Sequence, residues 1–169
     1  MVVGVVRGAF VLLVASVLAG CAAGYRPPPG AALGADYAEL TFELALTDMV
    51  GFGSATTQRF AIGTSPDETQ GQGIRMFTWA HKDPKVILVP SGQPLHVFAT
   101  MTGLWGAPGV THSGSDSCRN VSLFTPRANT RYRVSQVGEP TEGCRLRVID
   151  AATGTEPDDV SRIRFAPAA

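Results

Sequence analysis

The side chains best suited to chemistry are a few histidines and one short polar run. The three histidines are His81, His96 and His112. Their separations match none of the short spacings of metal-binding motifs. A copper or zinc site would need them to meet Met76, Met101 or Asp116 in space. Isolated histidines are more often surface or core residues, so we expect no metal and no other cofactor.

The polar run from His112 to Asp116 holds a base, hydroxyl groups and a carboxylate, the residue types of a catalytic triad. It lies in residues 102–117, the longest irregular stretch that we expect inside the domain. Neighbours in one loop do not bring these groups into contact, and no Gly-x-Ser-x-Gly elbow is present. We therefore expect a non-enzymatic protein. The alternative is an enzyme or a metal-handling protein that uses residues 102–117.

Arginines are concentrated late in the chain, where eight of the 14 basic residues follow Ser117. Four of them alternate with other residues along two predicted strands, and these are Arg131, Arg133, Arg145 and Arg147. Alternate residues point to opposite faces of a sheet, so pairing of the strands would place all four on one exposed face. Arg162 and Arg164 could extend it. Such a face could bind an anionic polymer, a lipid phosphate or an acidic partner.

The competing interpretation is that the protein's own carboxylates neutralise these arginines. The candidates are Glu39, Glu43, Glu139, Glu142 and Asp150. Solvated charged faces are ordinary on half-exposed sheets, which favours this interpretation over binding. The formal net charge of the chain is zero, so its overall charge indicates no particular partner.

The elements that would position these residues are short strands. Apolar residues occupy every second position from Leu40 to Leu46, a pattern typical of a half-buried strand. Further strands are predicted at 59–62, 74–79, 86–89, 95–100, 118–124, 130–137, 144–149 and 162–165. Few charged residues (17%) and many glycines and prolines also favour strands and turns. We predict an all-β fold, a single antiparallel β-sandwich of about eight strands over residues 37–169.

Two connections have the composition of tight turns. Residues 90–93, Pro-Ser-Gly-Gln, lie between apolar arms and predict a hairpin. Residues 138–143 connect the two arginine-bearing strands and predict a second hairpin.

The N-terminus is typical of a secretory signal. Arg7 precedes an apolar run from Ala9 to Leu18, which is shorter than the roughly 20 residues of a membrane-spanning helix. The run ends in Leu18-Ala19-Gly20-Cys21, which resembles the lipobox of bacterial lipoproteins. The resemblance covers residues 1–21 and concerns sorting alone. It implies that residues 1–20 are a signal peptide and that Cys21 is acylated and becomes the new N-terminus.

The residues after Cys21 bear on location. In lipoproteins of enteric-type bacteria, Asp in the next position favours the inner membrane, and here that residue is Ala22. The resemblance therefore implies lipid anchoring at the outer membrane, facing the periplasm, where nucleic acid is not an expected partner. Residues 21–36 are rich in Pro, Gly and Ala and predict a lipid-anchored tether.

With Cys21 assigned to lipid, Cys118 and Cys144 remain and predict a disulfide in an oxidising compartment. The bridge would close a loop of about 26 residues and contribute roughly 3–4 kcal/mol. If their strands flanked a common neighbour, the two Cα atoms would be roughly 9–10 Å apart, too far for a disulfide. Either the bridge passes over the end of that neighbour, or the strands belong to different sheets.

Two weaker resemblances concern the domain. The turn VPSGQP and the runs TRYRV and GCRLRVID are similar to small bacterial lipoproteins with an immunoglobulin-like or transthyretin-like sandwich. That resemblance implies a fold and no activity. Membrane-bound lysozyme inhibitors are also small disulfide-bonded β-domains, but their Ser-Gly-x-x-Tyr motif is not matched by Ser91-Gly92-Gln93-Pro94-Leu95.

We therefore expect a non-enzymatic, lipid-anchored cell-envelope protein with a binding or structural role. Its expected partners are the membrane, through the N-terminal lipid, and an anionic envelope component or an envelope protein. Inhibition of a hydrolase is a further alternative.

Overall fold

The computed structural model describes residues 24–44, 57–78, 81–104, 115–139 and 143–163, with backbone alone at 103–104, 115–118, 138–139 and 143–144. This part of the chain is all-β, with nine strands and one short 3-10 turn, η1 (Glu68–Gln70). The strands are β1 (Tyr37–Glu43), β2 (Thr57–Gly63), β3 (Gln72–Phe77), β4 (Lys85–Pro90), β5 (Leu95–Leu104), β6 (Ser115–Phe124), β7 (Arg131–Glu139), β8 (Gly143–Asp150) and β9 (Ser161–Ile163). None of the described residues belongs to a helix long and apolar enough to cross a membrane.

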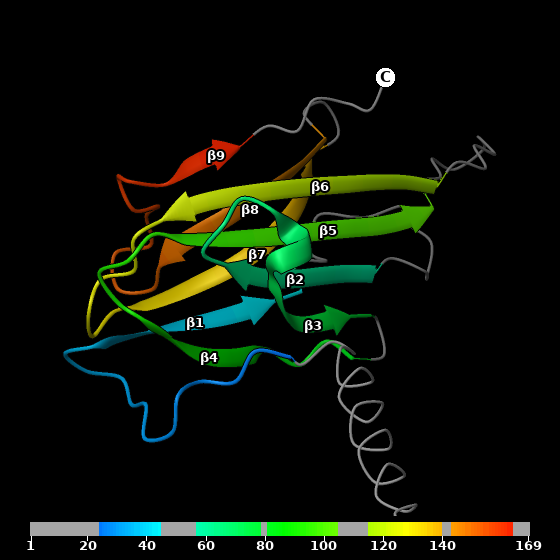
Figure 1. The fold of residues 1–169 in the computed structure, drawn as a ribbon. Helices are drawn as coiled ribbons and strands as arrows, with labels where there is room; N and C mark the ends of the chain where they lie inside the picture. The colour runs from blue at the N-terminus through cyan, green and yellow to red at the C-terminus, as the bar shows by residue number, and fades with distance from the viewer. Residues whose placement is uncertain (1–23, 45–56, 79–80, 105–114, 140–142, 164–169) are drawn as a thin grey trace, which may run out of the picture.

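The strands form two sheets that face each other like a sandwich (Figure 1). One sheet has four strands in the order β4-β1-β7-β8, and the other has five in the order β3-β2-β5-β6-β9. The prediction of purely antiparallel pairing is wrong at one place, because β1 and β7 run parallel. A tight turn forces the strands it joins to be antiparallel, whereas β1 and β7 are separated by most of the domain and carry no such constraint.

The predicted hairpin around residues 90–93 is also wrong. The chain does reverse there, at a left-handed glycine, Gly92 (φ 74°). However, β4 pairs with β1 in the four-stranded sheet, whereas β5 pairs with β2 and β6 in the other. Turn residues specify that the chain reverses, but they do not decide whether the two arms pair with each other. The connection therefore crosses from one sheet to the other.

Aromatic side chains join the two sheets in the core. Phe42 of β1 lies 5.3 Å, between ring centroids, from Phe60 of β2. Phe124 of β6 makes a similar contact with Tyr132 of β7 at 5.2 Å. All four rings are at most 2% exposed. Full burial of a phenylalanine contributes about 1.5–3 kcal/mol, so these contacts hold the sheets face to face.

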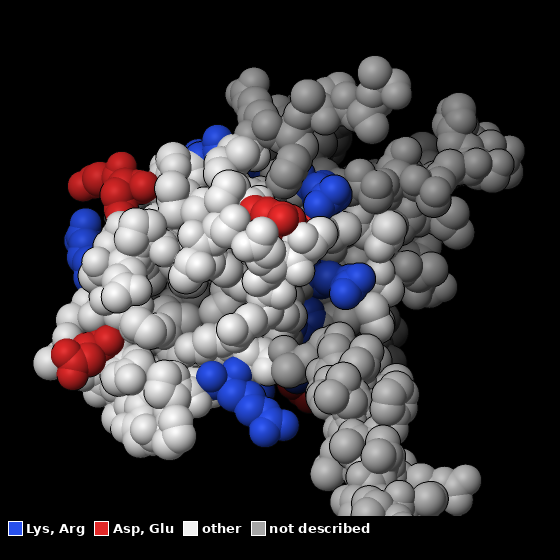
Figure 2. All heavy atoms as spheres, viewed as in Figure 1, with Lys and Arg blue, Asp and Glu red and all other residues white. Residues whose placement is uncertain are grey.

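Part of the outer face of the five-stranded sheet is covered by the segment from Thr64 to Gly71, which includes η1 (Figure 1). Phe98 of β5 lies beneath it and is 1% exposed. Gly63 and Gly71 approach the Phe98 ring so closely that a Cβ at either position would meet it at 3.4–3.5 Å. Glu68 also forms an ion pair with Arg119 of β6, which ties the segment to the sheet. Figure 2 shows positive and negative side chains on this side as separate groups, with uncharged surface between them.

Candidate functional site

The β7–β8 hairpin is present as predicted and carries the arginine face, defined as Arg131, Arg133, Arg145 and Arg147. The residues between them are buried, namely Tyr132, Val134, Leu146 and Val148. Because of this alternation, the four arginine side chains point away from the core, and all four reach solvent. In the strand register Arg133 lies opposite Ile149 and Arg147 lies opposite Ser135. Arg133 and Arg147 are therefore diagonal neighbours, roughly 7–8 Å apart.

Two of the predicted carboxylate partners lie on the neighbouring strand β1. Glu39 Oε1 is 3.3 Å from Arg131 Nε, close enough for an ion pair. Glu43 Oε2 is 3.9 Å from Arg133 Nε, which is beyond hydrogen-bond distance. The parallel β1–β7 pairing creates both contacts, because it places Glu39 beside Arg131. Neutralisation is therefore stronger at Arg131 than at Arg133.

Arg145 is paired with a carboxylate that the sequence analysis did not consider. Glu156, in the connection after β8, lies 3.6 Å from Arg145 and also pairs with Arg162 of β9. Since β9 belongs to the five-stranded sheet, Arg162 does not extend the arginine face. Arg164, like Glu142, lies outside the described residues, and the Glu139 side chain is not described.

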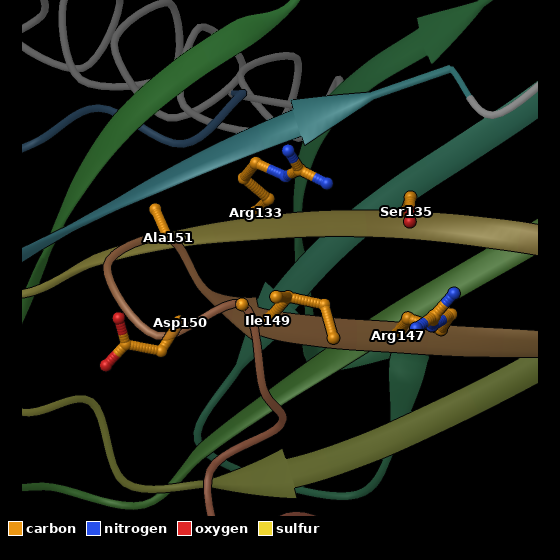
Figure 3. A pocket seen from close by; sticks show the side chains of 7 residues that line it. Arg133, Ser135, Arg147, Ile149, Asp150 and Ala151 are labelled. Carbon is orange, nitrogen blue, oxygen red and sulfur yellow. The ribbon is translucent and has the colours of Figure 1, made fainter.

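Arg147 makes no ion pair with a carboxylate of the described residues. Asp150 was a predicted partner, but its carboxylate accepts the backbone N–H groups of Ala152 at 2.8 Å and Thr153 at 3.4 Å. Figure 3 shows this carboxylate pointing away from Arg147 and Arg133. The turn that holds Asp150 closes at Gly154, whose φ of 72° is the left-handed conformation that glycine adopts without strain.

A hollow of about 150 Å³ lies over the middle of this face (Figure 3). Its lining residues are Arg133, Ser135, Arg147, Ile149, Asp150, Ala151 and Gly154. The hollow therefore contains the least neutralised pair of arginines together with a serine hydroxyl. Guanidinium groups bind carboxylate and phosphate oxygens through paired N–H donors, so this arrangement suits a small anionic group.

Sequence reasoning missed the rim of this hollow. The sequence analysis assigned no candidate residue to the connection that follows Asp150. The signal was present in Asp150 and Gly154, because an Asp that caps its own turn and a closing glycine are typical of a tight reversal after a strand. The shape of the hollow additionally depends on the β7–β8 register.

The candidate metal ligands whose side chains the structure describes are not brought together. His96 lies in β5 on the covered face and is 7% exposed, and burial lowers the pKa of its imidazole. His81 lies in the β3–β4 connection, where its ring contacts the Thr78 hydroxyl at 3.3 Å. Met76 is exposed and Met101 is buried. In the described ranges no three histidine, cysteine, aspartate or glutamate side chains cluster as metal ligands.

The predicted irregular stretch 102–117 is shorter than expected. Strands β5 and β6 pair as far as Leu104 and Ser115, so its ends belong to the sheet. Residues 105–114, including His112, lie outside the described part, and the Asp116 side chain is not described.

The strands of Cys118 and Cys144 belong to different sheets, β6 to one and β8 to the other. This is one of the two arrangements that the spacing argument left open. Among the described strands, β6 and β8 are the pair from opposite sheets whose Cα traces approach each other most extensively. The side chains of both cysteines, and Cys21 itself, lie outside the description.

Comparisons with protein-family models, with curated proteins and with solved structures find no match to this chain.

Proposed function

We propose that the protein is a non-enzymatic, lipid-anchored component of the cell envelope that binds an anionic partner through its arginine face. The observation that carries the binding proposal is the hollow around Arg133 and Arg147. Arg147 has no carboxylate partner among the described residues, and the nearest carboxylate to Arg133 is 3.9 Å away. Two guanidinium groups beside one hydroxyl would bind a phosphate, sulfate or carboxylate group.

The anchoring proposal is supported by the lipobox resemblance at Leu18-Ala19-Gly20-Cys21 and by the short apolar run before it. Attachment through acylated Cys21 would place the domain at the outer membrane, facing the periplasm. Anionic envelope components, polymers among them, are the partners that fit the hollow in that compartment. A disulfide between Cys118 and Cys144 is part of the same proposal.

The sorting half of the proposal is tested by Cys21→Ser. We expect this variant to lose metabolic labelling with fatty acid and to accumulate as unprocessed or mislocalised protein. Normal acylation and membrane fractionation of the variant would contradict the lipoprotein assignment.

The binding half is tested with polyphosphate as the anionic probe. Replacing all four arginines of the arginine face by Gln should weaken binding strongly at low salt and less at physiological salt, because the screening length falls from roughly 30 Å to 8 Å between 0.01 and 0.15 M. Equal binding by the variant and the natural protein at both salt concentrations would show that the arginine face is only a solvated surface.

A further inference from the structure

The N-terminal segment joins the sandwich through Tyr25, which touches the edge strands of both sheets. Its backbone N–H donates to the carbonyl of Gly73 on β3 at 2.9 Å, and its hydroxyl donates to the carbonyl of Leu88 on β4. Its ring packs against the hydrophobic core. Burial, and to a lesser extent Tyr37, raises the pKa of Tyr25, so the phenol keeps the proton that it donates. The described chain thus begins fixed to one side of the domain, beside β4 and below β3 in Figure 1.

This attachment lies very close to the proposed lipid. Tyr25 follows Cys21 by four residues, and an extended chain spans at most about 3.6 Å per residue. The lipid-bearing residue can therefore lie no farther than about 14 Å from Tyr25. A domain held at that distance cannot stand clear of the membrane, and the side that Tyr25 occupies is the one brought toward it.

The same side carries the surface chemistry of a lipid contact. Met76 of β3 and Val86 of β4 flank this edge, one on the outer face of each sheet. They are 55% and 50% exposed, and they are the exposed large hydrophobic residues of the described chain. Basic residues on these strands and the segments next to them are Arg26, Arg75, Lys82 and Lys85, and Asp83 is the acidic residue in the β3–β4 connection. Apolar groups that enter the headgroup boundary, surrounded by Lys and Arg, are typical of surfaces that rest on anionic membranes.

We propose that the β3–β4 edge is the membrane-facing surface of the protein, seated on anionic lipid headgroups and held there by Tyr25. This inference rests on the proposed acylation of Cys21. It also orients the arginine face. In the four-stranded sheet β8 is three strand spacings from β4, roughly 14 Å, so the hollow between Arg133 and Arg147 is raised above the lipid and accessible to a soluble or polymeric partner.

The test uses the mature acylated protein in vesicles of phosphatidylcholine and phosphatidylglycerol. A nitroxide is introduced through an unnatural amino acid at position 76, so that the native cysteines are not labelled. The matched control carries it at Ser161, which is exposed on β9, the opposite edge of the same sheet. Electron paramagnetic resonance then measures how accessible each label is to oxygen, which concentrates in lipid, and to a water-soluble nickel chelate.

We expect the label at position 76 to be reached by oxygen and protected from nickel, and the label at 161 to show the reverse. A label at 76 that is as accessible to nickel as the one at 161, in protein that co-floats with the vesicles, would overturn the inference and leave the lipid anchor standing. Protein that does not co-float would contradict the anchor itself, and the membrane-facing assignment would fail with it.

Tyr25 itself is tested in the same assay. Tyr25→Ala removes the ring and the hydroxyl, and we expect it to lose nickel protection at position 76 while still co-floating. Tyr25→Phe keeps the ring against the core and loses only the bond to Leu88, so most of the protection should remain. Full protection in Tyr25→Ala would show that Tyr25 does not hold the edge to the membrane.

Discussion

The outer faces of the two sheets differ in how far another segment of the chain covers them. The five-stranded sheet is partly covered by residues 64–71, and Phe98, His96 and Val121 of its outer side are at most 7% exposed. The four-stranded sheet is open on its outer side and carries the arginine face. The covered part of this face is therefore buried within the domain, whereas the open face is available for contacts with other molecules.

The difference is visible in the pattern of burial along the strands. In β5, residues of both parities are buried from His96 to Ala99, because both faces of the strand are covered. In β7 and β8 buried residues alternate with exposed or half-buried ones from Arg131 to Val137 and from Arg145 to Ile149. Alternation thus identifies an open face, and a continuous buried run in an antiparallel sheet indicates that another segment lies over it.

The largest effect that we expect comes from removing the buried aromatic ring beneath residues 64–71. Phe98→Ala should lower the free energy of unfolding by about 3–5 kcal/mol, since it leaves a cavity under residues 64–71. Chemical denaturation measures this change. Val86→Ala on the exposed side is the matched control and should cost much less. Similar losses in the two variants would mean that the two faces do not differ in burial.

The disulfide should come next in size. Cys118→Ala with Cys144→Ala should destabilise the domain by roughly 3–4 kcal/mol if a bridge joins β6 to β8 across the sheets. In the unmodified protein both thiols should resist alkylation until a reductant is added, as mass spectrometry would show. Ready alkylation of both cysteines in the native, oxidised protein would rule the bridge out.

Much of this architecture is predictable from residue pattern. Strict alternation located β1, the β7–β8 hairpin and its outward arginines. The errors concern relations between distant segments. The parallel β1–β7 pairing and the crossing between β4 and β5 both depend on which strands meet after collapse, and no local residue pattern encodes that choice.

The site shows the same division. Local pattern places Arg133 and Arg147 on one face, and it also suggests Glu39 and Glu43 as partners. It does not reveal that Asp150 turns onto its own loop, nor that Glu156 is shared between Arg145 and Arg162. These features determine which arginines have a carboxylate beside them and which can pair with a ligand instead. They arise from the loop after β8, which leads from the four-stranded sheet to β9 in the five-stranded sheet.

A smaller effect should be a pH dependence of the free energy of unfolding, which comes from His96 on the covered side. Burial lowers the pKa of His96 below its ordinary value of 6.5, so the unfolded chain takes up the proton first as pH falls. The stability that depends on neutral His96 is complete above pH 6.5 and is lost progressively as pH drops through the lowered folded value.

His96→Leu should reduce this loss, so the variant should gain stability relative to the natural protein at pH 5 compared with pH 7. Thermal denaturation at the two pH values measures the difference, and His81→Asn in the exposed β3–β4 connection is the control. The same acid-induced loss in the His96→Leu variant would assign it to other groups.

The smallest effect on stability should come from the open face. Arg133→Gln with Arg147→Gln should change the free energy of unfolding by about 1 kcal/mol or less, because exposed charge pairs contribute little. Charge reversal at Glu39 and Glu43 is the informative contrast in denaturation and anion-binding measurements. It should strengthen anion binding if the face is a binding surface, and mainly destabilise the sheet if the carboxylates serve only to neutralise it.

The most direct test of the binding proposal compares two pairs of arginines on the same hairpin. Arg133→Gln/Arg147→Gln removes the pair that lines the hollow, and Arg131→Gln/Arg145→Gln removes the pair held by carboxylates at 3.3 and 3.6 Å. Both double variants lose the same formal charge. Titration with polyphosphate at low salt should show a much larger loss of affinity for the first pair than for the second. Equal losses would reduce the arginine face to a general electrostatic surface and contradict a site at the hollow.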